Sequence, residues 1–370
     1  MKVIQILPEL NAGGVERGTL EVAAHLVANG HESIVISNGG RQVDDLEAAG
    51  SRHIRLPVHR KALASLWQIP ALRKIFIEEK PDIIHLRSRL PAWLAWLAWK
   101  TLDRRTRPRL VTTVHGFYSV NAYSAIMTKG EAVIAVSESV RDYILKNYPK
   151  MDSAKLRVIH RGVDQAVSPV GFVPSAEWLA QWKEAQPQLE GRIPLLMPGR
   201  ITRWKGQEGF LKLIAKLIDR GEPVHGLIVG EPHPKKLAFL DELKALAAAL
   251  GITAHITFSG HRSDLREIMA ISTVVYSLSL DPEAFGRVSL EALALGKPVI
   301  AYDHGGVAEQ LRVIFPQGLV KVGDIEGAIE LTCEILKSSP TPNSIEAFSL
   351  ERMLQSTLEV YQTLISPQGN

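Results

Sequence analysis

The chain has 370 residues, of which 46% are hydrophobic and 22% charged, a composition typical of a soluble α/β protein that buries a core in each of two domains. A single cysteine, Cys333, excludes an internal disulfide framework and a cysteine-rich metal site, and it fits a reducing compartment. The net charge is +4, but residues 1–165 hold 24 Lys and Arg against 16 Asp and Glu, whereas residues 166–370 hold 19 against 23.

The N-terminus, MKVIQILPEL, turns polar after seven residues, which is too short for the apolar core of a secretion signal. No apolar run approaches the roughly 20 residues of a transmembrane helix. We therefore expect a cytoplasmic protein. The basic first half is the surface that we expect an anionic partner to meet. The sequence contains no recognisable nucleic-acid-binding module, so nucleic acid is not an expected partner.

Strands and helices alternate in the first half at the spacing of βαβ units, which predicts a parallel sheet in a domain of residues 1–165. A helix is predicted at Glu16–Ala28, ended by Asn29-Gly30. The predicted strands are Val3–Leu7, Glu32–Ser37, Ile83–Leu86, Leu110–Val114, Ala132–Val136 and Leu156–Ile159.

A glycine turn, Asn11-Ala12-Gly13-Gly14, joins the first predicted strand to the first helix. Gly13 and Gly14 would let the backbone approach a diphosphate, and the start of the helix would supply N–H donors. The turn is not the G-x-G-x-x-G of dinucleotide enzymes. A turn with only a structural role is the alternative.

Residues 91–100 (PAWLAWLAWK) place Trp93, Trp96 and Trp99 three positions apart, on one side of a helix. Such a helix either packs into the core or meets a lipid headgroup interface with the arginines that follow it. These arginines are Arg104, Arg105, Arg107 and Arg109, and the basic residues that would extend the surface are Arg55, Arg60, Lys61, Arg73 and Lys74. Peripheral contact with an anionic membrane at its inner face is therefore an expectation.

The segment Thr112-Thr113-Val114-His115-Gly116 puts His115 at the end of a buried strand. Ligands bind at the carboxyl ends of strands in open α/β sheets, so His115 is a candidate active-site residue. A structural histidine beside the core is the alternative.

Residues 166–192 carry prolines and no clean strand pattern, so we expect an interdomain segment with a helix at Ala176–Ala185. A second βαβ domain is predicted over residues 193–343, with a helix at Pro234–Leu250. Its predicted strands are Ile193–Pro198, His225–Val229, His255–Ser259, Thr273–Ser277 and Pro298–Tyr302. One long amphipathic helix, Ser344–Ser366, is predicted within the terminal segment 344–370.

The stretch Pro198–Gly206 (PGRITRWKG) follows the first strand of the second half. Arg200 and Lys205 would neutralise a diphosphate, Arg through its planar fork and Lys as a point charge. Solvated surface charge is the alternative for both residues. Arg203 is a further charge to which the sequence assigns no role.

The segment Asp281–Glu291 (DPEAFGRVSLE) lies between a predicted strand, Ser272–Leu280, and a predicted helix, Val288–Leu295. The free N–H groups at this helix start favour a phosphate. The flanking carboxylates, Glu283 and Glu291, suit sugar hydroxyls better. A sugar attached to a diphosphate satisfies both demands.

These blocks resemble a known family. E-A-F-G-R-V-S-L-E, followed by G-K-P-V-I-A at Gly296–Ala301 and G-G-V-A-E at Gly305–Glu309, is similar to the retaining nucleotide-sugar glycosyltransferases of the GT-B fold. More narrowly, it resembles the large fourth glycosyltransferase family, of group 1 type. The likeness covers nearly the whole chain. It implies an α/β fold of two Rossmann-like parallel-sheet domains facing an interdomain cleft, with an N-terminal acceptor domain, a C-terminal donor domain and a last helix that returns to the first domain.

The resemblance also implies roles for residues. Glu283 and His115 would be catalytic, and Glu291 would bind the ribose. The role implied for His115 is a hydrogen bond to the sugar, or a backbone carbonyl near the developing cation. The residues implied for the donor diphosphate are Arg200, Lys205, Gly13, Gly14, Val288 and Ser289, and those for the donor sugar are Glu283, Ala284, Phe285 and Gly286. Arg161 stands in R-G-V-D where the family has N-G-V-D, and this departure leaves the role of that turn open.

No D-x-D pair or zinc-type spacing is present, so we expect no metal and no cofactor, only a nucleoside-diphosphate sugar as co-substrate. The resemblance implies a uridine or guanosine diphosphate donor and transfer of a hexose-type sugar to a glycan or glycolipid acceptor in bacterial lipopolysaccharide or polysaccharide assembly. Two alternatives remain open: a sugar-nucleotide 2-epimerase of GT-B fold, and a catalytically silent sugar-nucleotide-binding subunit.

Overall fold

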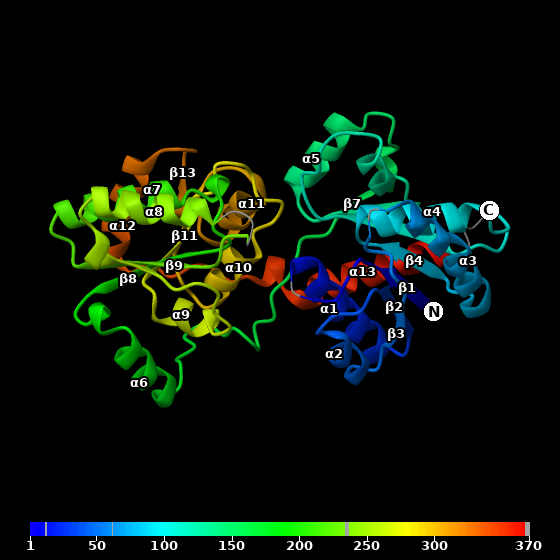
Figure 1. Ribbon diagram of the computed structural model, residues 1–370, viewed down its shortest axis with the longest axis horizontal. Coiled ribbons are helices and arrows are strands. Elements are labelled where there is room, and N and C mark those ends of the chain that lie inside the picture. The colour runs from blue at the N-terminus through cyan, green and yellow to red at the C-terminus, as the bar shows by residue number, and fades with distance from the viewer. Residues whose placement is uncertain (12, 61, 234–236, 367–370) are drawn as a thin grey trace. The chain divides into compact units, whose positions relative to one another are not determined.

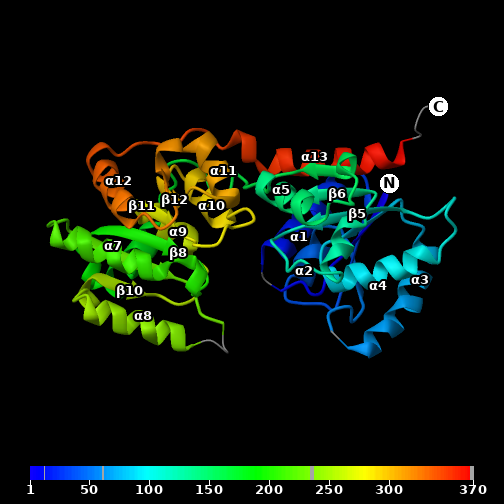
Figure 2. The ribbon, with the colours of Figure 1, turned by 90° about the horizontal axis from the view of Figure 1, so that it is seen from above.

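The computed structural model describes residues 1–11, 13–60, 62–233 and 237–366. The chain forms two compact units (Figure 1). Unit 1 combines Met1–Arg161 with the C-terminal residues from Glu351 onward, and unit 2 is Gly162–Leu350. In each unit the connections between parallel strands place helices on both faces of the sheet (Figures 1 and 2). The predicted α/β class, with two Rossmann-like parallel sheets, is confirmed.

Unit 1 is built on a seven-stranded sheet whose paired strands are all parallel. In order across the sheet the strands are β3 (Arg52–Arg55), β2 (Glu32–Ser37), β1 (Lys2–Ile6), β4 (Ile83–Leu86), β5 (Arg109–Val114), β6 (Ala132–Ala135) and β7 (Leu156–Val158). The strand order reverses between β1 and β4. The carboxyl ends of strands beside such a reversal are where open parallel sheets bind ligands.

The central strands of unit 1 are apolar on both faces because helices cover both sides of the sheet. Val3, Ile4 and Ile6 of β1 are fully buried, and burial of each such side chain stabilises the fold by about 1.5–3 kcal/mol. The helices of unit 1 are α1 (Gly14–Ala28), α2 (Val43–Ala48), α3 (Gln68–Glu79), α4 (Arg89–Lys100), α5 (Glu138–Asn147) and α13 (Leu350–Ile365).

Helix α13 starts later than predicted. The sequence predicted one helix from Ser344, but residues 346–348 form a 3-10 turn and Ser349 pairs with Val163 in an isolated bridge, so the α-helix begins at Leu350. The helix packs in unit 1, where the Tyr361 hydroxyl lies 2.6 Å from Nδ1 of His85. Residues 367–370 of the predicted terminal segment lie outside the described residues.

Helix α4 packs into the core of unit 1, in line with the first of the two readings of its tryptophans. Trp99 is buried and its indole N–H donates to the Pro108 carbonyl at 2.7 Å. Trp93 donates to the Tyr123 carbonyl at 2.8 Å, and α4 packs beside α3 (Figure 2). None of the helices in the described part of the chain has both the length and the apolar character needed to cross a bilayer.

Unit 2 is built on a six-stranded parallel sheet. In order across the sheet the strands are β10 (Ile256–Phe258), β9 (Val224–Val229), β8 (Ile193–Pro198), β11 (Val274–Ser277), β12 (Val299–Tyr302) and β13 (Leu319–Val320). The order reverses between β8 and β11. The helices are α6 (Ala176–Ala185), α7 (Gln207–Asp219), α8 (Ala238–Ala249), α9 (Leu265–Ile271), α10 (Arg287–Ala294), α11 (Gly305–Ile314) and α12 (Ile325–Ser338).

The segment expected between the domains, residues 166–192, belongs to unit 2. Its helix α6 has the predicted bounds, Ala176–Ala185, and is tied down by the Trp178 indole, which donates to Asp264 at 2.8 Å. The next predicted helix is shorter than expected, because α8 starts at Ala238. Residues 234–236 of that prediction lie outside the described residues.

Candidate active site

The strand reversal in unit 2 brings together two segments that lie far apart in sequence. Strand β8 is followed by Gly199–Lys205, and its neighbour β11 is followed by the segment from Leu278 to Gly286. Both segments leave the carboxyl edge of the sheet at the same place. Lys205 and Glu283 therefore meet, and Arg200 lies on the same edge, at the position where a parallel sheet of this order binds ligands.

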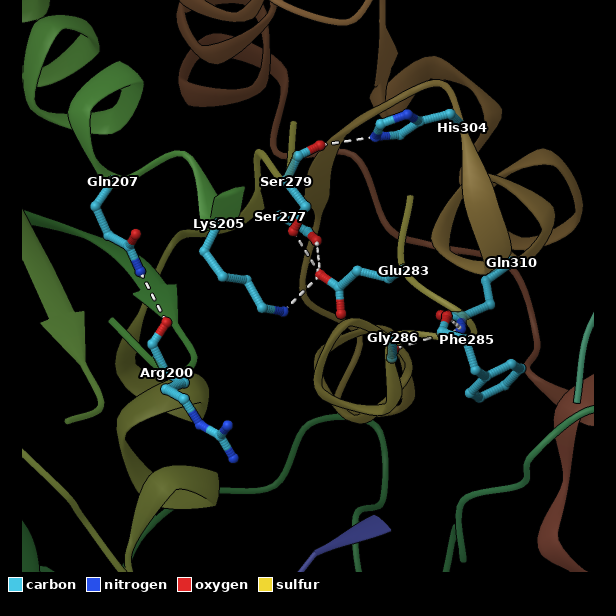
Figure 3. A network of polar contacts seen from close by, with 10 residues as sticks. All are labelled: Arg200, Lys205, Gln207, Ser277, Ser279, Glu283, Phe285, Gly286, His304 and Gln310. Carbon is cyan, nitrogen blue, oxygen red and sulfur yellow. Dashed lines mark hydrogen bonds and ion pairs between the residues drawn. The ribbon is translucent and has the colours of Figure 1, made fainter. Parts of the chain in front are cut away.

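Glu283 is held by three donors that converge on one of its oxygens (Figure 3). Oε1 lies 2.7 Å from Lys205 Nζ, accepts a hydrogen bond from Ser279 at 2.7 Å and accepts another from Ser277 at 3.2 Å. No described residue donates a hydrogen bond to Oε2, which points away from these donors in Figure 3. The carboxylate is thus fixed through Oε1 and presents Oε2 to a ligand.

The surroundings of Glu283 keep it ionised. Burial alone would raise the pKa of this carboxyl, but the Lys205 charge and the hydrogen bonds from Lys205, Ser279 and Ser277 outweigh burial and lower its pKa below the ordinary 4.5. Only 15% of the side chain is exposed. Near neutral pH the site therefore holds a carboxylate that accepts hydrogen bonds.

The backbone around Glu283 is fixed by the glycines that start α11. The Gly306 N–H donates to the Glu283 carbonyl at 2.8 Å, and a Cβ at Gly306 would lie 2.5 Å from the Phe285 Cα. The Gln310 side chain donates to the Phe285 carbonyl at 2.5 Å. The Phe285 ring is buried against Phe348, and this packing anchors the loop. The sequence blocks E-A-F-G and G-G-V-A-E form one packed substructure.

Three polar residues in this network were not predicted from the sequence. Ser277 and Ser279 fix Glu283, and His304 donates from Nε2 to the Ser279 carbonyl at 2.7 Å. The two serines point to the same place because they are two positions apart at the end of β11. That spacing was the available signal, whereas the contact of His304 depends on the neighbouring strand.

Lys205 and Arg200 occupy different surroundings. Lys205 is 18% exposed and precedes Gly206, which has φ of +82° and passes so close to the Leu278 carbonyl that a side chain would clash there. Arg200 is exposed, and its carbonyl is fixed by the Gln207 amide at 3.1 Å. Arg203, which had no predicted role, binds the Glu242 carboxylate at 2.6 Å on the surface.

A cavity of about 430 Å³ opens beside Arg200. Val288, in the first turn of α10, also lines this cavity, so the cavity extends from the loop that carries Arg200 to the start of α10. Arg262 also lines it and is paired with Asp264 at 2.6 Å. The lining residues are Gly199, Arg200, Val229, Gly230, Glu231, Pro232, His233, His261, Arg262, Leu265 and Val288. Its size and position suit a nucleoside beside a phosphate site.

Helix α10 begins directly after Gly286, whose φ of +83° is left-handed. The first helical residues are Arg287, Val288 and Ser289, so their amides lie at the predicted helix start, and Ser289 is buried. Glu291 lies one turn further and is 3.3 Å from Arg287 Nε. Ala284 and Phe285 complete the turn between Glu283 and Gly286. The predicted residues from Glu283 to Glu291 thus lie in one loop and in the helix that follows it.

In unit 1, His115 follows β5 and its Nδ1 lies 2.7 Å from Nη2 of Arg161. Burial and the nearby charges of Arg161 and Arg87 hold the pKa of His115 well below its ordinary 6.5. Gly13 and Gly14 lie at the start of α1, after β1, and the Gly13 carbonyl accepts from the Arg17 amide at 3.0 Å. Residue 12 of the same turn lies outside the described residues.

A buried polar network lies beneath this edge of unit 1. Arg87 is only 2% exposed and donates from Nε to Gln5 at 2.7 Å. His85 contacts Thr113 and Tyr361 through its two ring nitrogens, each at 2.6 Å. Burial raises the pKa of Tyr361 to about 12, although the Arg87 charge opposes this rise. The network fixes the strand ends that carry the candidate residues. Nowhere in the described residues do three or more His, Cys, Asp or Glu side chains gather in a way that would hold a metal ion.

Comparison with known proteins assigns the chain to a family. Residues 12–167 match the family described as Glycosyltransferase Family 4, and residues 180–351 match Glycosyl transferases group 1. A glycosyltransferase from Rickettsia africae ESF-5 has a similar crystal structure, with 31% identity, a TM-score of 0.86 and 99% of each chain covered. The Anabaena protein HepE, solved with UDP and glucose, shares the fold at 20% identity and a TM-score of 0.79, with 99% of this chain and 100% of that chain covered.

Among curated proteins, a D-inositol 3-phosphate glycosyltransferase of Rhodococcus erythropolis (strain PR4 / NBRC 100887) is 35% identical over 189 residues. The match covers 46% of this chain and 41% of that protein, so the chain spans less than half the length of this relative. The Rickettsia structure, in contrast, is matched over 99% of its chain. The chain belongs to the group 1 glycosyltransferases of glycosyltransferase family 4, enzymes of the GT-B fold.

Proposed function

We propose that this glycosyltransferase is a retaining, metal-independent hexosyltransferase. It moves a hexose from a nucleoside-diphosphate sugar to a glycan or glycolipid acceptor in bacterial lipopolysaccharide or polysaccharide assembly. The observation that carries this proposal is the 2.7 Å contact between Lys205 and Glu283 at the strand reversal of unit 2. Lys205 lies in the segment that follows β8, and Glu283 lies in the loop that leads to the start of α10. A cation and a carboxylate so placed suit a diphosphate and the sugar attached to it.

The chemistry of unit 2 supports the proposal that it binds the donor. The nucleoside enters the cavity beside Arg200, with its ribose toward Glu291. The diphosphate meets Arg200, Lys205 and the first amides of α10, because cations and a helix start both favour anions. The sugar hydroxyls donate to Glu283 Oε2. HepE, which shares this fold, was solved with UDP and glucose, and this supports a uridine diphosphate hexose as the first donor to test.

The proposed reaction retains the anomeric configuration. The bond from the sugar C1 to the diphosphate oxygen breaks, and a bond from C1 to the acceptor oxygen forms on the same face. The acceptor proton passes to the departing diphosphate oxygen, so no protein base is required. Arg200 and Lys205 neutralise the leaving group and supply the charge that a divalent cation provides in other transferases. The Glu283 carboxylate offsets positive charge that develops at C1.

A polyol phosphate is the second candidate for the acceptor. The Rhodococcus relative is named for transfer to D-inositol 3-phosphate, and it is more similar in sequence than HepE over the part that matches. Unit 1, which would receive the acceptor, is the basic part of the chain, with 24 Lys and Arg against 16 Asp and Glu in residues 1–165. These cations favour an acceptor that bears a phosphate over a neutral glycan.

We also propose that unit 1 contacts an anionic membrane, through a surface other than the α4 tryptophans. The 3-10 turn Leu63–Trp67 exposes Leu66 and 80% of Trp67, and Ile77 of α3 is 45% exposed. Three exposed basic residues flank them in sequence: Arg60, Arg73 and Lys74. Exposed apolar side chains beside cations suit a headgroup interface.

The test is a transfer assay with UDP-, GDP- and ADP-hexoses against oligosaccharide, glycolipid and inositol phosphate acceptors. The anomeric configuration of the product is read by NMR. We expect one donor to be used, with the configuration of the donor retained and with no loss of rate in EDTA. An inverted product, or a free epimerised sugar formed without an acceptor, would overturn the proposal. Binding of a nucleotide sugar without turnover on any acceptor would favour a silent binding subunit.

A further inference from the structure

Arg161 places its guanidinium against the imidazole of His115, and this contact decides which ring nitrogen carries the proton. Nη2 of Arg161 lies 2.7 Å from Nδ1 of His115. A guanidinium has only N–H donors and stays charged, so Nδ1 must accept. The ring therefore carries its single proton on Nε2. In this protein the tautomer follows from one contact.

The position of Arg161 is built by three elements of unit 1. It follows β7, while His115 follows β5, and β6 lies between these strands. On the other side the guanidinium lies against α1 at Gly18, where a Cβ would come within 2.6 Å of Nη1. Met353 of α13 is also in contact, with Sδ 3.9 Å from Nη1. The glycine in α1 makes room for the guanidinium, and the helices limit where it can go.

The charges around the ring also keep His115 neutral. Burial has the largest effect on its pKa, and the positive charges of Arg161 and Arg87 and the nearby His85 lower the pKa further. The hydroxyl oxygen of Tyr118 accepts a hydrogen bond from the His115 backbone N–H at 3.2 Å, so this contact involves the backbone of His115 and not its ring. A second proton would give the ring a positive charge, which the charges of Arg161 and Arg87 disfavour.

The protonated nitrogen of His115 is left for a ligand. Nε2 is buried and has no hydrogen-bond partner among the residues that the structure describes. A buried N–H without a partner is unfavourable, so sites that retain one commonly present it to a bound group. His115 directly follows β5, so this nitrogen lies at the carboxyl edge of the sheet.

We propose that Arg161 is a positioning residue that holds His115 as the Nε2–H tautomer, so that the ring donates one hydrogen bond to a hydroxyl oxygen of a substrate bound at this edge of unit 1. The identity of the recipient rests on the proposed transferase function, whereas the tautomer does not. His115 in this state cannot serve as a general base, because Nδ1 is occupied and Nε2 already bears a proton. This agrees with a reaction in which the leaving diphosphate takes the acceptor proton.

The first test is an NMR measurement on the full chain with histidines labelled with 15N. Two-bond proton–nitrogen correlations distinguish the two neutral tautomers and the imidazolium, and the His115 signals are those lost in His115→Gln. We expect the Nε2–H pattern at pH 7. The Nδ1–H pattern or an imidazolium would overturn the proposal. This measurement needs no substrate, so its outcome is separate from the success or failure of the transferase assignment.

The second test compares Arg161→Met with Arg157→Met. Arg157 is an exposed arginine on β7 that bonds to the carbonyls of Ala154 and Leu156. Arg161→Met should give a mixture of His115 tautomers, a higher pKa of the ring and a loss of kcat of about 10-fold, the scale of one hydrogen bond. The KM for the donor nucleotide sugar should stay within about twofold, and Arg157→Met should change none of these quantities.

Two further variants separate positioning from general stability. Arg161→Lys keeps a cationic donor and should recover part of the lost kcat together with the Nε2–H pattern. Gly18→Ala retains Arg161 but should displace its guanidinium. It should therefore give the same mixture of His115 tautomers as Arg161→Met. If Arg161→Met retains the Nε2–H pattern or the wild-type kcat, the proposal is wrong. If Arg161→Met does not fold, the tautomer of His115 in Gly18→Ala and in the wild type decides the question.

Discussion

Lys205 Nζ lies 2.7 Å from Glu283 Oε1, so the cation assigned to the diphosphate and the carboxylate assigned to the sugar form an ion pair with each other. Both side chains are less than one-fifth exposed, and a partly buried pair is screened less than a surface pair. Each residue therefore holds the other in position before a substrate arrives. A bound diphosphate would share Lys205 with Glu283 and draw the two halves of the donor site together.

Replacement of Glu283 by Gln should lower kcat by on the order of 100-fold, the scale of one lost electrostatic contact to a transition state. The amide retains the shape of the side chain and can still accept from Ser277 and Ser279, so UDP affinity and the melting temperature should change little. Isothermal titration and a transfer assay measure the two effects. Glu242→Gln, on the surface, is the control. Loss of nucleotide binding together with activity would make Glu283 a structural residue instead.

Replacement of Lys205 by Met should shift the acid limb of the pH profile upward. In the wild type the pKa of Glu283 is lowered, so the carboxylate contributes stability that is present above its ordinary 4.5 and is lost as the pH falls through its lower folded value. Without Lys205, burial is opposed only by the two serines, and the pKa rises. The pH dependence of kcat in the two proteins provides the comparison. An unchanged acid limb would show that Lys205 does not control the ionisation of Glu283.

Gly306→Ala should destabilise unit 2 by about 1–3 kcal/mol, the usual cost of overpacking. The added methyl group would meet the Phe285 Cα and push the Glu283 loop away from α11. Activity should fall with stability, because Glu283 is carried by this loop. Val313→Ala, at an exposed position of the same helix, should leave both unchanged. Thermal unfolding and the transfer assay are the measurements, and equal behaviour of the two variants would contradict this account.

Trp67→Ser should reduce binding to vesicles that contain anionic lipid. The indole is the most exposed large apolar side chain of the proposed membrane surface, and the basic residues near it make binding weaken as salt increases. Val173→Ser, which removes an exposed apolar side chain from unit 2, is the control. Vesicle sedimentation at two salt concentrations measures both. Equal binding by wild type and Trp67→Ser would rule out this surface.

Most strands and the loop residues of the donor site could be predicted because their signals are local. The apolar run before Gly199 and the block E-A-F-G specify a strand end and a helix start within about ten residues of sequence. Strand β3 (Arg52–Arg55) was missed because its sequence, R-H-I-R, lacks an apolar run, and it forms by pairing with β2 at the sheet edge. Strand β13 has only two residues and carries no pattern.

The contacts that fix the site could not be predicted because they join distant residues. His304 reaches the Ser279 carbonyl from the end of a neighbouring strand, and Arg161 reaches His115 from two strands away. Arg161 was visible only as a departure from the family motif. The tryptophan spacing in α4 did not distinguish a core helix from an interfacial one, because both present indoles on one side, and only the packing against Pro108 and Tyr123 decides between them.

The central claim is that side-chain cations of unit 2 hold a nucleoside diphosphate without a metal. The most direct test is the melting temperature with UDP, GDP, ADP, TDP and the matching monophosphates, each with and without EDTA, because a ligand of the folded state raises it by mass action. One diphosphate should raise the melting temperature, EDTA should not change the shift, and Arg200→Ala with Lys205→Ala should weaken that diphosphate by about 10-fold or more while changing the monophosphate far less. Arg203→Ala should match the wild type. Equal weakening of diphosphate and monophosphate, or a shift abolished by EDTA, would contradict the account.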